Sequence, residues 1–134
     1  MAVHDLEATY LGLGVEGGVA VMPGGAEFWR TVADNPNLGG YLVTVSVGEG
    51  DWPQWEMHPQ GDEVLVTLEG EGDVILEHPD GSLTRHDMRP GVMLVVPKGA
   101  WHRGVRQAGL KLLFITWGAG TTHRPVTDED RARG

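Results

Sequence analysis

Short apolar segments separated by turn residues are the feature that most limits what this chain can fold into. The segments are rich in valine, leucine, isoleucine and threonine, which favour extended backbone, and they are bounded by glycine, proline or Asp-Gly. Turn signals recur about every 8–12 residues, which is typical of a β-sandwich or barrel. The sequence therefore predicts an all-β fold with strands at Gly40–Gly48, Asp62–Gly70, Gly72–His78, Gly91–Pro97 and Leu110–Gly118.

The remaining segments complete a single predicted domain spanning residues 1–134, with its barrel core at about 40–118. The Asp-Gly pair within His78–Ser82 predicts a hairpin turn. A short helix is predicted over Ala26–Asn35, because Phe28 and Val32 lie four residues apart on one helical face. Residues 119–134 are polar and are predicted to form a loop-like tail that is mobile at its end.

Charge and composition exclude several classes of function. The formal charge of −9 repels nucleic-acid phosphates and anionic membrane surfaces, so neither is expected as a partner. The absence of cysteine excludes disulfides, thiolate metal sites and a cysteine nucleophile. No apolar run reaches membrane length, and we expect a soluble, cytoplasmic protein.

Acids and a histidine crowd into the stretch Gly50–Gly70, directly before and within an apolar segment. Residues two apart in a strand project from the same face, so Glu56 and His58 are predicted to point together. The turn residues Pro59–Gly61 follow, and Glu63 opens the returning strand, from which it can face the same point. One hairpin thus converges three potential metal ligands.

A fourth donor is available from a second bend in the chain. His102 follows the turn-forming sequence at residues 97–100 and is predicted to begin another strand. A barrel that brings the two bends together would place His102 beside the three donors of the first hairpin. Imidazole and carboxylate suit divalent iron, manganese, zinc or nickel, and four donors around an octahedral ion leave two positions for water or substrate.

The spacing in both stretches resembles the two sequence motifs of the cupin superfamily. The first motif there is Gly, five residues, His, one, His, three or four, Glu, six, Gly, and the second is Gly, five, Pro, one, Gly, two, His, three, Asn. The matching positions in this chain are Gly50, Glu56, His58, Glu63, Gly70, Gly91, Pro97, Gly99, His102 and Arg106. The chain thus resembles a small single-domain bacterial cupin in which Glu56 replaces the first histidine and Arg106 replaces the asparagine.

This resemblance implies a cupin-type double-stranded β-helix, that is, a jelly-roll barrel. It implies a metal site whose ligands are Glu56, His58, Glu63 and His102. Asp62 is the alternative acidic ligand, because the family allows a gap of three residues, but Glu63 is preferred. By alternation along the strand, Arg106 is predicted to share the face of His102 and to contact an anionic ligand at the barrel mouth.

Two classes of function fit these predictions. The first is a metal-dependent enzyme on a small molecule, either an oxygenase or a sugar-isomerase-like protein in which Glu56 moves a proton. The second is a non-catalytic barrel that binds or senses a small molecule. Two carboxylates favour manganese or iron, with zinc or nickel as alternatives, because they cancel a divalent charge and are hard donors. The resemblance also implies a homodimer.

Overall fold

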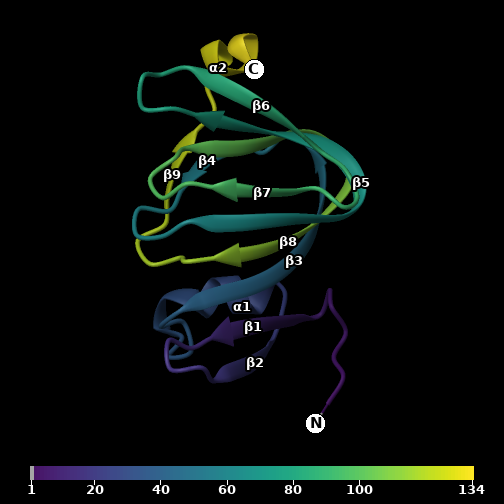
Figure 1. Cartoon of the computed structure of the whole chain (residues 1–134), viewed down its shortest axis with the longest axis vertical. Coiled ribbons are helices and arrows are strands. Elements are labelled where there is room, and N and C mark those ends of the chain that lie inside the picture. The colour runs from purple at the N-terminus through teal and green to yellow at the C-terminus, as the bar shows by residue number, and fades with distance from the viewer. Residues whose placement is uncertain (1) are drawn as a thin grey trace.

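The computed structural model describes residues 2–134, and these residues form an antiparallel β-barrel with short helices near both chain ends (Figure 1). The nine strands of this described part are β1 (Thr9–Leu13), β2 (Val19–Pro23), β3 (Tyr41–Gly50), β4 (Gln54–Met57), β5 (Glu63–Glu77), β6 (Leu83–Met88), β7 (Met93–Val96), β8 (His102–Thr116) and β9 (Thr122–Pro125). The helices are α1 (Ala26–Thr31), the 3₁₀ turn η1 (Val32–Asp34) and α2 (Asp128–Arg133). The predicted all-β class is confirmed.

Two long strands, β5 and β8, form the centre of the sheet and curve around the barrel (Figure 1). They pair from Glu63 opposite Thr116 to Leu76 opposite His102, with irregular register between residues 67 and 73. Gly70 lies in this irregular part with φ +73, and a Cβ there would lie 2.1 Å from the carbonyl oxygen of Gly109. Only glycine fits such a close backbone approach, which explains why the first motif ends in this residue.

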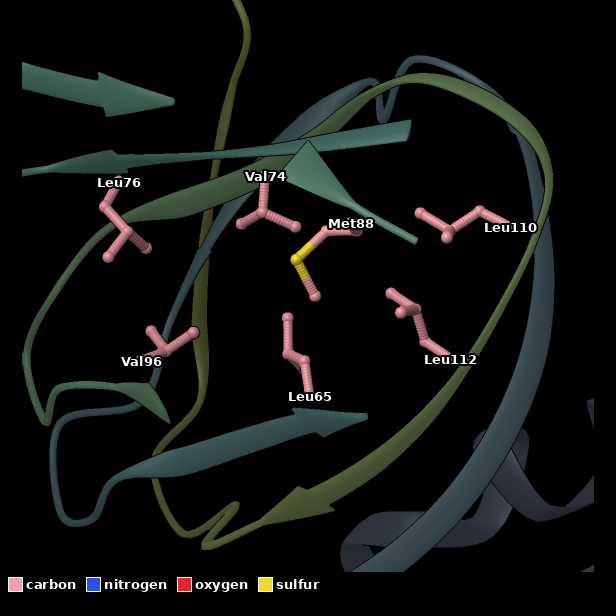
Figure 2. Close-up of a cluster of buried hydrophobic side chains, with 7 residues drawn as sticks. All are labelled: Leu65, Val74, Leu76, Met88, Val96, Leu110 and Leu112. Atoms are coloured by element: carbon pink, nitrogen blue, oxygen red, sulfur yellow. The ribbon is translucent and has the colours of Figure 1, made fainter. Parts of the chain in front are cut away.

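Alternate residues of these strands point inward and fill the barrel (Figure 2). The side chains of this inner cluster are Leu65, Val74, Leu76, Met88, Val96, Leu110 and Leu112. All seven are buried, and Leu65, Val74 and Met88 are fully enclosed. Burial of each such side chain contributes about 1.5–3 kcal/mol, so the inner cluster supplies much of the stability of the barrel.

A smaller layer formed by β1, β2 and α1 extends the sheet beyond β3 (Figure 1). Phe28 of α1 packs edge-on against Tyr10 of β1, with ring centroids 5.0 Å apart. Met22 and Leu42 complete this second cluster. The predicted helix is confirmed in place, but its α-helical part ends at Thr31 and continues as η1 to Asp34.

The prediction of a loop-like tail at residues 119–134 is wrong, because this segment forms β9 and α2. Strand β9 pairs antiparallel with β4, from Gln54 opposite Pro125 to Met57 opposite Thr122. Helix α2 begins with a capping box, in which Thr127 and Asp130 each accept a hydrogen bond from the backbone N–H of the other. The sequence Thr-Asp-Glu-Asp at residues 127–130 carried this signal.

The predicted strands are confirmed in place, with two differences in extent. The segments Asp62–Gly70 and Gly72–His78 belong to the single strand β5, and β8 begins at His102, well before the predicted Leu110. The hairpin turn at His78–Ser82 is confirmed by a hydrogen bond from the N–H of His78 to the carbonyl of Ser82. Across residues 2–134, no helix has the length and apolar character needed to span a bilayer.

Candidate metal centre

Three strand ends carry the candidate metal ligands. Glu56 lies in β4 and His58 follows directly after that strand, while Glu63 and His102 are the first residues of β5 and β8. The loops before β5 and β8 are joined by a hydrogen bond of 2.9 Å from the N–H of Gly99 to the carbonyl of His58. The two bends of the chain are therefore fixed to each other, as the sequence predicted. The predicted hairpin of Glu56 and Glu63 is wrong, because β4 pairs with β8 and β9 while β5 pairs with β6, β7 and β8.

The four side chains converge, and one potential ligand atom from each lies within 4.8 Å of all the others. The Nε2 atoms of His58 and His102 are each 3.2 Å from a carboxylate oxygen of Glu63 and 3.5 Å from Oε2 of Glu56. Ligand bonds of about 2.1 Å in an octahedral shell place adjacent ligand atoms about 3 Å apart. The observed separations match that spacing, so the group could hold a metal ion.

Hydrogen bonds at the other ring nitrogens set the orientation of both imidazoles. Nδ1 of His102 lies 3.2 Å from the carbonyl oxygen of Ala100, which only accepts, so this nitrogen carries the proton. Nδ1 of His58 lies 2.8 Å from the hydroxyl of Thr121, and that hydroxyl donates to the carbonyl of Gly118. Nδ1 of His58 is therefore a donor too, and both Nε2 atoms face the centre of the group.

Buried polar atoms without regular hydrogen bonds support a metal at this centre. Nε2 of His58, Nε2 of His102 and Oε1 of Glu63 make no hydrogen bond of regular geometry among residues 2–134, and their contacts of 3.2–3.5 Å are with the other members of the group. Buried polar atoms that lack a well-formed hydrogen bond are rare in native proteins. A divalent cation bound between these atoms would satisfy all three of them at once.

The acid–base state of the metal-free group follows from burial and charge. Burial lowers the pKa of both imidazoles, but the adjacent carboxylates of Glu56 and Glu63 outweigh it. They raise the pKa of His58 to about 9 and the pKa of His102 to about 9. Burial raises the pKa of both carboxyls, but the close contacts and positive charge of His102 and His58 outweigh it and hold each pKa below its ordinary value.

The structure also separates the two candidate acidic ligands. Glu63 is 2 % exposed and belongs to the four-residue group, whereas Asp62 is exposed and accepts a hydrogen bond from the N–H of Lys98. The preference for Glu63 over Asp62 agrees with this arrangement. Asp62 has instead a structural contact, which ties the loop before β5 to the loop before β8.

The predicted orientation of Arg106 is wrong. This residue has φ 51 and lies where the β5–β8 register is irregular, so the alternation that would place it on the face of His102 is interrupted. Its guanidinium donates a hydrogen bond of 2.6 Å to Oδ2 of Asp73, and its backbone N–H donates to the carboxylate of Asp51. A ligand-binding role for Arg106 stays a prediction. The shared face with His102, on which that prediction was based, is not present.

Three residues that the sequence did not single out surround the group. The hydroxyl of Thr116 donates to Oε2 of Glu63 over 2.5 Å, and Thr121 binds His58 as described. Nε2 of His123 lies 3.2 Å from Oε1 of Glu56. No local signal marked these residues, because each reaches the group through pairing between strands that are distant in sequence.

The fold and this group together define a class of protein, a jelly-roll β-barrel with a candidate centre for a divalent metal ion. The sequence pattern of the Cupin domain matches residues 41–117, which is more than half of the chain. The chain therefore belongs to the cupin family, and the resemblance found in the sequence is confirmed. No curated protein matches the chain significantly in sequence.

Several solved structures are similar to this chain. Protein NMB1881 from Neisseria meningitidis is 33% identical, with 57% of this chain and 72% of that chain covered and a TM-score of 0.45. A cupin-2 domain containing protein from Shewanella frigidimarina is 26% identical, with 57% and 70% covered and a TM-score of 0.47. Bacillus subtilis oxalate decarboxylase, a protein with Mn(II) centres, is 17% identical, with 65% and 24% covered and a TM-score of 0.53. This last likeness concerns the fold alone.

Proposed function

We propose that this cupin binds one divalent metal ion, manganese or ferrous iron, and acts on a small molecule at the positions that the protein leaves open on the ion. The ligands would be Glu56, His58, Glu63 and His102. The observation that carries the proposal is the convergence of four potential ligand atoms within 4.8 Å of one another, with no regular hydrogen bond at Nε2 of His58, Nε2 of His102 or Oε1 of Glu63 among the described residues.

Charge supports a divalent ion in particular. The metal-free group holds two imidazolium and two carboxylate side chains at neutral pH, because its histidine pKa values are raised and its glutamate pKa values are lowered. Two neutral imidazoles, two carboxylates and a divalent cation also sum to zero. One such ion can therefore replace two protons without changing the net charge. Two carboxylate donors favour manganese and ferrous iron over softer ions, with zinc and nickel as competitors.

The chemistry we propose is that of an oxygenase or an isomerase. A bound ion would supply Lewis acidity toward a substrate oxygen or a position for dioxygen. Glu56 is the residue placed to move a proton, because its side chain is 24% exposed while those of His58, Glu63 and His102 are nearly inaccessible. The inner cluster fills the barrel (Figure 2), so a substrate would approach from the side of Glu56.

The test begins with the metal content of the purified protein, measured by elemental analysis. Protein loaded with Mn²⁺ or Fe²⁺ under anaerobic conditions is then assayed for oxygen uptake and for isomerisation across a panel of small hydroxy acids, diketones and sugars. His102→Ala is the matched inactive variant, and His86→Ala, on β6 and hydrogen-bonded to Thr84, is the control. Stoichiometric metal without turnover would favour the non-catalytic binding barrel, and failure to bind any divalent ion would overturn the proposal.

A further inference from the structure

Side chains of the C-terminal segment, residues 118–134, contact two of the four candidate ligands, His58 and Glu56. We name this segment the C-terminal strap. Within it, the hydroxyl of Thr121 accepts a hydrogen bond from Nδ1 of His58, because its own proton is directed to the carbonyl of Gly118. This contact fixes the tautomer in which Nε2 of His58 presents its lone pair to a metal ion.

The second contact of the strap is made to Glu56. In the sheet, Glu56 of β4 lies opposite His102 of β8 on one side and opposite His123 of β9 on the other. Nε2 of His123 is 3.2 Å from Oε1 of Glu56, while Oε2 of Glu56 is the oxygen nearest the two candidate imidazole ligands. His123 therefore holds the outer oxygen of the carboxylate and turns the inner oxygen toward the ion.

The strap is anchored on the outer face of the same strand that carries Glu56. The guanidinium of Arg124 contacts the rings of Trp55 and Trp101, 5.0 and 4.5 Å from their centroids, and donates a hydrogen bond of 2.8 Å to Glu77. The indole N–H of Trp55 donates to Asp130 of α2 over 3.0 Å. Trp55 is fully buried by this packing, and it directly precedes Glu56 in the chain.

From these contacts we infer that the C-terminal strap is a positioning element for the metal centre, and that metal binding and strap docking are coupled. Strand β4 connects the two, with Glu56 on its inner face and Trp55 on its outer face. Coupling between two sites is reciprocal, so whatever loosens the strap weakens metal binding, and metal binding tightens the strap. This inference rests on the proposed metal-binding function.

The first experiment measures Mn²⁺ affinity by calorimetry and the Mn²⁺ environment by electron paramagnetic resonance. Thr121→Val and His123→Ala are expected to weaken Mn²⁺ binding by about 10- to 100-fold and to change the spectrum, which is the usual effect of losing an outer hydrogen bond. Thr121→Ser keeps the hydroxyl and should restore both readouts. Thr122→Val is the matched control, because Thr122 is exposed and its hydroxyl donates to the carbonyl of Gly120, its one hydrogen bond within residues 2–134.

The second experiment acts at a distance from the ligands. Arg124→Met keeps an apolar stem beside the two indoles but removes the charge, and it should weaken Mn²⁺ binding without changing any ligand. In the unaltered chain, hydrogen exchange at the amides of α2 should slow when Mn²⁺ is added. Wild-type protein that binds no divalent ion would overturn the proposed function. Wild-type protein that binds Mn²⁺, with unchanged affinity in Thr121→Val, His123→Ala and Arg124→Met and no change in exchange at α2, would overturn the coupling alone.

Discussion

Thr116, near the end of β8, donates a hydrogen bond of 2.5 Å to Oε2 of Glu63, the residue directly opposite it at the start of β5. The bond leaves Oε1 of Glu63 as the oxygen without a regular hydrogen bond among the described residues, 3.2 Å from Nε2 of His102. One strand pair therefore decides which oxygen of the carboxylate is available to a metal ion.

Replacing Thr116 by valine should weaken metal binding, because the carboxylate of Glu63 would lose the partner that orients it. We expect about a 10- to 100-fold loss of Mn²⁺ affinity in calorimetry. Thr67→Val is the control on the same strand as Glu63, since the buried hydroxyl of Thr67 has no partner among residues 2–134. That control should leave affinity unchanged and leave stability unchanged or slightly higher. Equal affinity in the two variants would show that the Thr116 bond does not orient Glu63.

Substitution of Glu63 and, separately, of Asp62 tests which of the two is the acidic ligand. Glu63→Gln should reduce Mn²⁺ affinity by at least about 100-fold, more than the loss of an outer partner, because it removes a charged donor. Asp62→Asn should leave affinity unchanged, because Asp62 is exposed and binds the N–H of Lys98. Circular dichroism on both variants checks the fold. The reverse order of affinities would assign the ligand to Asp62.

Metal binding should release protons. The carboxylates raise the pKa of His58 and of His102 from 6.5 to about 9, so both imidazoles are protonated at pH 7 and must lose a proton to bind an ion. Calorimetry at pH 7 in buffers of different ionisation enthalpy should report nearly two protons released per ion. Mn²⁺ affinity should rise by up to about 100-fold per pH unit below pH 9 and level off above it.

The same shifts predict how the metal-free protein responds to pH. A raised folded-state pKa contributes stability that is fully present below the unfolded value of 6.5 and is lost as pH rises through about 9. Urea unfolding of the metal-free protein should therefore give a lower free energy of unfolding at about pH 9.5 than at about pH 6.5. The first pH lies above the folded-state pKa, and the second lies at the unfolded value. His58→Asn should remove part of this difference, and an unchanged pH profile in that variant would contradict the assignment.

The inner cluster should dominate the stability of the barrel. Leu65 is fully buried at its centre (Figure 2), and Leu65→Ala should lower the free energy of unfolding by about 2–5 kcal/mol. Leu6→Ala is the control, since Leu6 is 47% exposed and surface truncations usually change stability by less than about 0.5 kcal/mol. Similar losses in both variants, measured by urea unfolding, would show that the barrel interior is not the main core.

Association into a homodimer remains a prediction, and exposed apolar residues on two edge strands provide its test. Val21 of β2 and Val95 of β7 are 50% and 53% exposed, and each strand pairs with a single neighbour. Light scattering should give the mass of a dimer for the unaltered chain. Either Val21→Lys or Val95→Lys should give a monomer, and this difference identifies the edge that is used. A monomeric mass for the unaltered chain at high concentration would contradict the prediction.

Local sequence determined the strands, the hairpin turn and the four candidate ligands. Strand alternation places Glu56 and His58 on one side of the chain, and the turn residues before Glu63 reverse its direction. The convergence of these residues also needs sheet pairing, because β4 pairs with β8 and β9 whereas β5 pairs with β6, β7 and β8. The motif glycine Gly70 likewise reflects a local need, the close approach to Gly109. The capping box at Thr127 and Asp130 is equally local, and the sequence contained the signal for α2 although the prediction missed it.

Tertiary structure alone decided the surroundings of the centre. Thr116, Thr121 and His123 reach the candidate ligands only because β8 pairs with β5 and β9 pairs with β4, and no spacing along the chain encodes those registers. The orientation of Arg106 was likewise not predictable from strand alternation. An irregular register and φ 51 turn its side chain from the expected face toward Asp73. Pairing between distant strands depends on the free energy of the whole sheet, whereas the identity of the four donors can be found from their spacing along the chain.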